Sequence, residues 1–520
     1  MTTPLRPITS ETPDQHNKHI VKPPAFTSKD IKEYTKTRFT SLWVGRKELS
    51  KYPWYEICNP FHPLIALNAH QWNFFFLGFW GWTWDAFDFF ITSLNVTNIA
   101  NDLQVSTKDV TWGITLVLMF RTVGAAIFGA IGDNFGMKWP YILNMVLLML
   151  IQIGTGFVTT YSQFLGVRAL FGIAMGGIYG NCSAEALGDA PRKARGILSG
   201  IFQSGWPSGY LLAVVFQRAF EMTEKTWQNM FFFSAGVPVI FITWRFFNPE
   251  TFVYQRQRAR FREGAIQKES KIAEFRHQAL KALRTYWMII IYMVLLMSGF
   301  NFSSHGSQDL YPTMLTSEYH YGPNRATVVN VCANLGGIFG GIIISHLSTY
   351  FGRRTLMICA NTFGGAFLYL WAFKPTWITA FLMQFGTQGA WSVVPIHLNE
   401  LAPPQFRSFV VGVSYQLGNL ISSASATIEA TMNETLHDLG KTMAIFEGAV
   451  LCYLIPILFI GPEHKGAELG VERDDRMSVH GGDDDDDDVE DNSYGEHDKK
   501  DSEFEKVPEV VEVAKDGGKV

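Results

Sequence analysis

The chain has 520 residues, 47% of them apolar, with 42 phenylalanines and 15 tryptophans. Its formal net charge of -4 owes much to an acidic C-terminal end and gives no support to a nucleic-acid partner. The sequence has no phosphate-cradling loop, nucleophile constellation or metal-ligand spacing, so we expect neither an enzyme nor a bound cofactor.

Apolar segments of about 20 residues, the length that crosses a bilayer core, recur through the middle of the chain. The predicted spans cover residues 71–95, 110–132, 139–159, 163–186, 196–217, 229–247, 284–303, 326–348, 355–373, 376–397, 408–430 and 442–461. The longest polar interruption, 248–283, divides them six and six. The sequence therefore predicts an all-α membrane protein, surrounded by lipid, with about twelve transmembrane helices in two six-helix halves at 71–247 and 284–461.

Lysines and arginines gather in segment 248–283 and in the other loops on the same side of the predicted membrane. By the positive-inside rule, this basic middle loop and both tails, 1–70 and 462–520, are expected to be cytoplasmic. We expect the tails to be disordered, because the C-terminal one is rich in charge and contains the run from Asp483 to Asp488. Its lysines and serines are candidate marks for ubiquitin-ligase machinery, and a merely solvated tail is the alternative.

Two loops in corresponding positions of the halves repeat a Phe-Gly-x-basic pattern. The first lies between spans two and three and the second between spans eight and nine. The loop residues that we assign to gating are Gly129, Asp133, Gly136, Lys138, Gly352, Arg353 and Arg354. Glycines allow close approach and sharp turns, and the acid can pair with a base or a helix N-terminus in one conformation only. A purely topogenic basic loop is the alternative.

A second repeated pattern places Glu185 at the end of span four and Glu400 just after span ten, each followed by proline and arginine. We expect both glutamates to pair with the nearby basic loops.

Charged side chains inside a span are costly and are candidates for function. Span one carries Asp85 and Asp88, span two carries Arg121, and span four carries Arg168. The guanidinium of Arg121 can bind a carboxylate through two hydrogen bonds, and a permanent ion pair with Asp85 or Asp88 is the alternative. For the two aspartates, a proton site and a structural partner remain open, whereas for Arg168 we favour a structural pair.

The densest polar cluster lies at the end of span seven. Asn301, His305, Asp309 and Thr313 are four residues apart, so on a helix they form one stripe, which must avoid lipid. An imidazole one turn from a carboxylate can change charge near neutral pH, which suits proton coupling. Gln416 in span eleven could hydrogen-bond a carboxylate, or join two helices instead.

The first repeated loop resembles the signature of the major facilitator superfamily, which implies the major facilitator fold. The span-seven string resembles the signature of the fungal lactate permease family of carboxylate–proton symporters, Asn-x-x-Ser/Thr-His-x-Ser/Thr-Gln-Asp-x-x-x-Thr. Every fixed position is filled, from Asn301 to Thr313. The resemblance implies that Asn301, His305 and Asp309 handle substrate and proton, and that Arg121 and Gln416 contact the substrate.

A segment of span five looks like the pore-lining segment of the same family. The family's monocarboxylate carriers tend to have a bulky aromatic residue where this chain has Ser208. A smaller side chain leaves room for a longer diacid. This comparison slightly favours dicarboxylates and makes Ser208 a candidate substrate-binding residue.

We therefore expect a plasma-membrane symporter that imports short carboxylates together with protons by alternating access. Lactate, pyruvate and acetate are candidate substrates, as are malate and succinate. Two alternatives stay open: a carrier of another solute, such as sugar or phosphate, on the same fold, and a nutrient sensor that binds without transporting.

Overall fold

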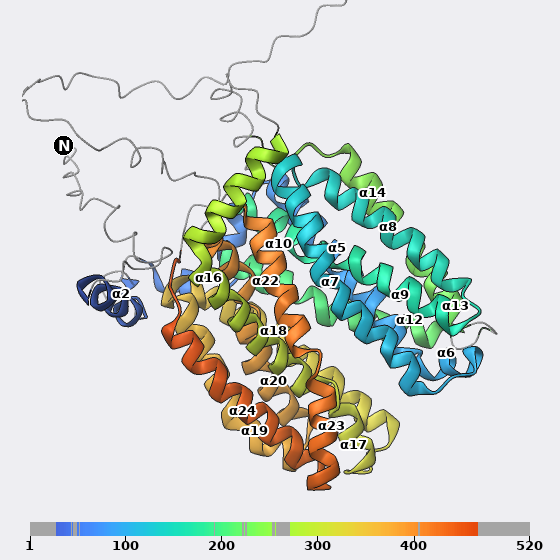
Figure 1. The fold of residues 1–520 in the computed structure, drawn as a ribbon. Helices are drawn as coiled ribbons and strands as arrows, with labels where there is room; N and C mark the ends of the chain where they lie inside the picture. The colour runs from blue at the N-terminus through green and yellow to red at the C-terminus, as the bar shows by residue number, and fades with distance from the viewer. Residues whose placement is uncertain are drawn as a thin grey trace, which may run out of the picture. The chain divides into compact units, whose positions relative to one another are not determined.

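The computed structural model describes residues 28–42, 44, 49–50, 52–191, 193–220, 223, 226–251, 255, 271–403 and 406–465. All regular elements in these residues are helices (Figure 1). Half of the predicted middle loop, and the C-terminal tail from residue 466 on, lie outside them, and so do the candidate ubiquitin marks.

The helices of the first half match the six predicted spans. They are α5 (Ala69–Leu94), α7 (Thr107–Phe135), α8 (Lys138–Gly156), α9 (Tyr161–Gly176) with α10 (Ile178–Gly188), α11 (Arg195–Gln203) with α12 (Gly205–Phe220), and α13 (Thr226–Gly236) with α14 (Pro238–Phe247). A short helix, α6 (Val96–Leu103), links α5 to α7.

The second half repeats this plan. Its helices are α16 (Lys271–Gln308) with the short α17 (Tyr311–Ser317), α18 (Pro323–Phe351), α19 (Arg353–Phe373), α20 (Trp377–Trp391) with α21 (Val394–Leu401), α22 (Arg407–Ser422) with α23 (Ser425–Leu436), and α24 (Leu439–Ile460). Among the described residues, seven helical segments are by length and apolarity alone long enough to span a membrane. The remaining predicted spans fall on α5 and on four helices interrupted near their middle.

The two repeated loops have the same backbone. Gly136 ends α7 with φ +94°, and Gly352 ends α18 with φ +99°, a conformation that residues with a side chain rarely adopt. Each glycine lets the chain reverse within one residue into the next helix, which begins at Lys138 or Arg353. We call the end of the bundle that carries these loops the basic end.

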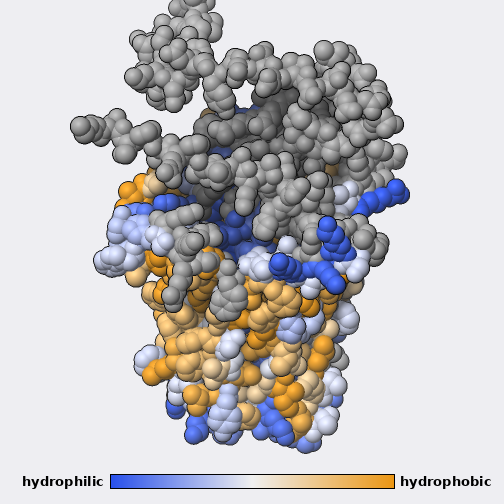
Figure 2. All heavy atoms as spheres, turned by 90° about the vertical axis from the view of Figure 1, so that its left-hand side faces the viewer, coloured by the Kyte–Doolittle hydropathy of each residue, from blue (hydrophilic) through white to orange (hydrophobic). Residues whose placement is uncertain are grey.

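The helix surface is apolar where lipid is expected. Figure 2 shows a broad hydrophobic band across the helices, with hydrophilic residues at the end of the bundle opposite the grey segments. Many large apolar side chains on this surface are exposed, among them Ile127, Leu150 and Phe339. Apolar residues that face outward over the length of a span are what a bilayer requires.

The expectation of a disordered N-terminal tail is wrong for the described residues between 28 and 66. They form α2 (Ser28–Thr40), α4 (Trp54–Cys58) and a 3-10 turn (His62–Ala66). This N-terminal segment lies on the basic end, where Arg354 Nη1 donates to the carbonyl of Arg38 at 3.2 Å and His346 Nε2 lies 3.1 Å from the carbonyl of Glu56. Composition alone missed this contact because the segment's backbone carbonyls, rather than its side chains, satisfy buried donors of the second half.

Candidate functional site

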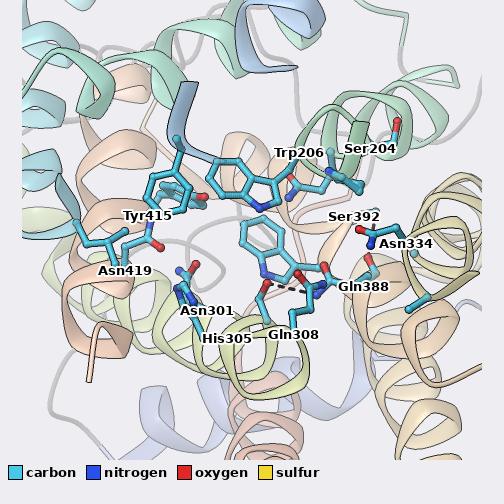
Figure 3. A pocket seen from close by; sticks show the side chains of 18 of the residues that line it. Ser204, Trp206, Asn301, His305, Gln308, Asn334, Gln388, Ser392, Tyr415 and Asn419 are labelled. Carbon is cyan, nitrogen blue, oxygen red and sulfur yellow. Dashed lines mark hydrogen bonds between the residues drawn. The ribbon is translucent and has the colours of Figure 1, made fainter. Parts of the chain in front are cut away.

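A cavity of about 720 Å³, counted with its open mouth, lies between the two halves (Figure 3). Helices α5, α7, α11 and α12 line it from the first half, and α16, α18, α20 and α22 from the second. Two of the helix interruptions, at Ser204 and Ser392, lie in its wall. Its polar lining residues are Arg121, Gln203, Ser204, Asn301, Ser304, His305, Gln308, Asn334, Gln388, Ser392 and Asn419, and the aromatic ones are Phe89, Trp206, Trp391 and Tyr415.

Arg121 is the cationic feature of the first-half wall. Its side chain is 1% exposed, and its guanidinium carbon lies 5.8 Å from the ring centre of Trp206 and 5.9 Å from that of Tyr415. Its Nη2 is 3.8 Å from a carboxylate oxygen of Asp85, too long for a hydrogen bond. Within the described residues, Nε and Nη2 have no hydrogen-bond partner. A buried guanidinium with unused donors beside a cavity is suited to binding an anion.

The polar stripe of span seven forms part of the opposite wall. Asn301, Ser304 and His305 project from α16 into the cavity, and the Gln388 amide donates to the hydroxyl of Ser304 at 3.3 Å (Figure 3). His305 Nδ1 lies 2.9 Å from a carboxylate oxygen of Asp309, which follows the helix end. The predicted contact between these two side chains is therefore present. Asp309 is 44% exposed and lies beyond the cavity lining.

The two aspartates of span one have different partners. Asp85 faces Arg121, whereas the positive charge that acts on Asp88 is that of Arg168. Arg168 also donates to Thr92 at 2.8 Å and to Gln152 at 3.0 Å. Arg168 is thus tied to buried partners away from the cavity lining, as the structural interpretation of this residue predicts.

Two candidate substrate residues lie outside the cavity lining. The Ser208 hydroxyl donates to the carbonyl of Ser204 at 2.7 Å, so it faces its own helix. Gln416 is fully buried, and its side-chain oxygen accepts from Asn419 at 3.0 Å. Asn419 lines the cavity, and Gln416 contacts the cavity residues only through this hydrogen bond to Asn419. The volume argument for a diacid at Ser208 therefore has no support in this conformation.

The sequence analysis missed much of the lining. Asn334 and Gln388 are amides within the apolar spans eight and ten. Because a polar side chain inside a span costs free energy, the sequence alone could have identified both as candidates. The aromatic residues Trp206, Trp391 and Tyr415 had no such signal, because aromatic residues are abundant throughout these helices.

The halves contact each other at the basic end. The Asp133 carboxylate accepts the backbone N–H groups of Ser408 at 3.1 Å and Phe409 at 2.8 Å, at the start of α22. Gly129 packs against the same turn, since a Cβ there would lie 2.7 Å from the Phe409 Cα. In the second half, Thr349 replaces the acid and lies against Gly196 at the start of α11. The repeated loops thus each meet the first turn of a helix from the other half.

Two of the basic gating candidates bind backbone carbonyls near helix ends of their own halves, and Arg354 also binds the N-terminal segment. Lys138 Nζ donates to the carbonyls of Phe246 and Asn248, both at 2.8 Å, at the C-terminal end of α14. Arg354 donates to the Leu458 carbonyl at 2.7 Å, near the end of α24. Cations at helix C-termini stabilise the exposed carbonyls.

The prediction that Glu400 pairs with a basic loop is confirmed, and the partner is Arg353 of the loop between spans eight and nine, which binds it through Nε at 3.1 Å and Nη2 at 3.0 Å. Glu185 instead pairs with Arg245 of α14, at 2.8 Å. The prediction for Glu185 was wrong because α14 brings an arginine closer than the loop does.

Twelve helical rods in two repeated halves, a polar cavity between them and a lipid-facing apolar surface define a multi-pass membrane transporter of the major facilitator superfamily. Residues 64–473 match the family model described as "Sugar (and other) transporter", and the chain belongs to this family. It is a transporter and not an enzyme.

Relatives with assigned names support the same class. The chain is 38% identical over 467 residues to a carboxylic acid transporter protein homolog of Saccharomyces cerevisiae, which covers 85% of this chain and 75% of that one. It is 25% identical over 408 residues to a cis,cis-muconate transport protein of Acinetobacter baylyi, covering 76% and 95% of the two chains. Among solved structures, the proton:xylose symporter XylE bound to 6-bromo-6-deoxy-D-glucose superposes with a TM-score of 0.63 at 16% identity, covering 77% and 98%.

Proposed function

We propose that this transporter imports short-chain carboxylates together with protons across the plasma membrane. The observation that carries the proposal is the buried guanidinium of Arg121, which has unused donors and shares a cavity with Asn301 and His305. The similarity to a carboxylic acid transporter homolog supports it. So does the intact span-seven string that resembles the lactate permease signature.

In the proposed mechanism the basic end faces the cytoplasm, with both termini, and remains closed while the cavity takes up substrate from outside. The carboxylate binds the unused donors of Arg121, and Asn301 and Asn419 orient it. A buried anion needs its charge offset, and a proton on His305 supplies part of that offset. Asp309 accepts the imidazole hydrogen bond. Release of the contacts at the basic end then exposes substrate and proton to the cytoplasm.

The choice among carboxylates belongs to the same proposal. Lactate, pyruvate and acetate need one cationic partner, whereas malate and succinate need a second donor set. The amides of Gln308, Asn334 and Gln388 lie in the second-half wall and could bind a second carboxylate or a hydroxyl. We therefore keep both monocarboxylates and dicarboxylates as substrates to be tested.

Uptake into liposomes that contain the purified protein tests the proposal directly. With an acid-outside gradient, labelled lactate or succinate should accumulate with simultaneous alkalinisation of the external buffer. Protein-free liposomes correct for passive entry of the uncharged acid. Competition by unlabelled lactate, succinate, xylose and phosphate separates a carboxylate carrier from the sugar and phosphate alternatives. Binding without accumulation would indicate a sensor and contradict the proposal.

A further inference from the structure

Two glutamates lie inside the second half, outside the cavity lining and away from the residues used above. Glu429 is on α23 and Glu447 is on α24, and both are 0% exposed. Within the described residues, both carboxylate oxygens of Glu429 and the Oε2 of Glu447 lack a hydrogen-bond partner. Buried carboxylates are expensive unless they are paired with a cation or protonated.

The neighbours of these side chains are acidic or neutral. The charged groups that act on Glu429 are Asp309 and Glu447. The Ser303 hydroxyl donates to Glu447 Oε1 at 2.5 Å, from the face of α16 away from the cavity stripe. In the part of the chain that the structure describes, no lysine, arginine or histidine forms a salt bridge with either glutamate, and no acidic or histidine cluster could hold a metal ion.

Helix packing brings the pair close to the span-seven string. Glu447 Oε2 would lie 3.4 Å from a Cβ at position 306, so it touches the backbone of α16 beside His305. The rings of Phe302 and Phe446 pack at 6.1 Å on the same face. Glu447 therefore meets α16 at Ser303 and Gly306, two positions that the string leaves variable, on the side away from Arg121.

We propose that Glu429 and Glu447 form a proton-binding site within the second half, connected to the exterior through Asp309. Glu429 is seven residues from the end of α23 and Glu447 eight from the start of α24, about 10 Å and 12 Å from the end of the bundle opposite the basic end. Asp309, which is 44% exposed, lies at that end. A proton from water passes by way of Asp309 to a carboxylate oxygen of either glutamate, and only O–H bonds form and break.

The inference rests on the proposed proton coupling, which would give this proton site its role in transport. A proton on Glu447 beside Ser303 lies on the face of α16 opposite the substrate-facing residues Asn301 and His305. When this proton binds or leaves, the charge on the face of α16 away from the cavity changes, and the cavity itself stays open. In this arrangement the carboxylate substrate and the proton bind on opposite faces of the same helix.

Glutamine substitutions test the site, because an amide resembles the protonated acid in shape but cannot release a proton. We would compare Glu447→Gln and Glu429→Gln with Glu434→Gln, which changes an exposed glutamate on the same helix α23. Infrared difference spectra between acid and neutral pH should show the carbonyl band of a protonated carboxylic acid in wild type. This band should shrink in the two buried variants and remain in Glu434→Gln. An unchanged band in the buried variants would overturn the proposal.

Transport provides the second measurement. A gradient of one pH unit supports about tenfold accumulation of a monocarboxylate carried with one proton. Glu447→Gln and Glu429→Gln should lose this accumulation yet keep lactate counterflow, in which no net proton movement is needed. Wild-type accumulation in both variants, or loss of counterflow together with accumulation, would overturn the inference. If wild type accumulates no acid while the infrared band behaves as expected, the proposed function fails and the proton site stands.

Discussion

The carboxylate of Asp133 accepts the backbone N–H of Phe409 at 2.8 Å, and this bond joins the two halves of the transporter at the basic end. Asp133 lies in the last turn of α7 in the first half, and Phe409 belongs to the first turn of α22 in the second. The N–H groups of a first helical turn lack partners within the helix, so a carboxylate from the other half caps them well. Opening this end would require the bond to break.

We predict that Asp133→Ala shifts the protein toward opening at the basic end. Hydrogen bonds to a charged acceptor contribute about 1.5–3 kcal/mol each, so losing two should change the open fraction by at least about 100-fold. Hydrogen–deuterium exchange at the start of α22 should accelerate. Asp133→Asn retains one acceptor oxygen and should give an intermediate rate. Equal exchange in all three proteins would show that the bond does not hold the end closed.

Close packing of α11 against α18 should be needed for the same closure. A Cβ on Gly200 would lie 2.5 Å from the carbonyl oxygen of Gly341, so Gly200→Leu must separate these helices. The matched control is Gly166→Leu, because a Cβ at Gly166 meets no atom within 4 Å.

The measurement is thiol labelling at Ser345→Cys, with the exposed cysteines Cys58, Cys359 and Cys452 replaced by alanine. Labelling should be faster and carboxylate uptake lower with Gly200→Leu than with Gly166→Leu. Similar labelling in both proteins would contradict the role of this contact.

Arg121 should contribute to stability and transport in separable ways. Arg121→Gln leaves Asp85 buried without a cation, a loss of about 3–5 kcal/mol for a broken buried pair. The double variant Arg121→Gln with Asp85→Asn removes both charges and should recover most of the thermal stability while uptake stays abolished. Recovery of uptake in the double variant would rule out Arg121 as the anion site.

Arg121→Lys refines this test. A lysine retains the positive charge but loses the planar fork that binds a carboxylate through two hydrogen bonds. We expect a stable protein with a raised KM for lactate uptake. A KM equal to that of wild type would indicate that charge alone suffices.

The pair of Glu185 and Arg245 should be asymmetric in its contribution to folding. Both side chains are 0% exposed, and Arg245 also pairs with Glu250 at 3.1 Å and donates to the Pro249 carbonyl at 2.7 Å. Arg245→Leu leaves the buried carboxylate of Glu185 without a cation and should destabilise the protein by about 3–5 kcal/mol. Glu185→Gln leaves Arg245 with its other partners and should cost less. Thermal unfolding in detergent measures both, and an equal loss would contradict this assignment.

Periodicity was sufficient to predict the parts of this transporter that depend on a single helix. Apolar length predicted twelve spans, and the four-residue spacing of Asn301, His305 and Asp309 predicted one stripe. Helix geometry explains this success: 3.6 residues per turn place such residues on one face whatever surrounds them. The repeated Phe-Gly loops were recognisable for the same reason, since the turn at Gly136 or Gly352 is local.

Contacts between helices were decided only by the tertiary structure. Asp85 and Asp88 are three residues apart, yet one faces Arg121 and the other Arg168. Gln416 lies behind Asn419 rather than in the cavity, and Glu447 meets the far side of α16. One residue turns a helix by about 100°, so the partner of a buried polar group depends on the rotation and tilt of two helices. Packing of the whole bundle sets these quantities, and no local pattern in the sequence contains them.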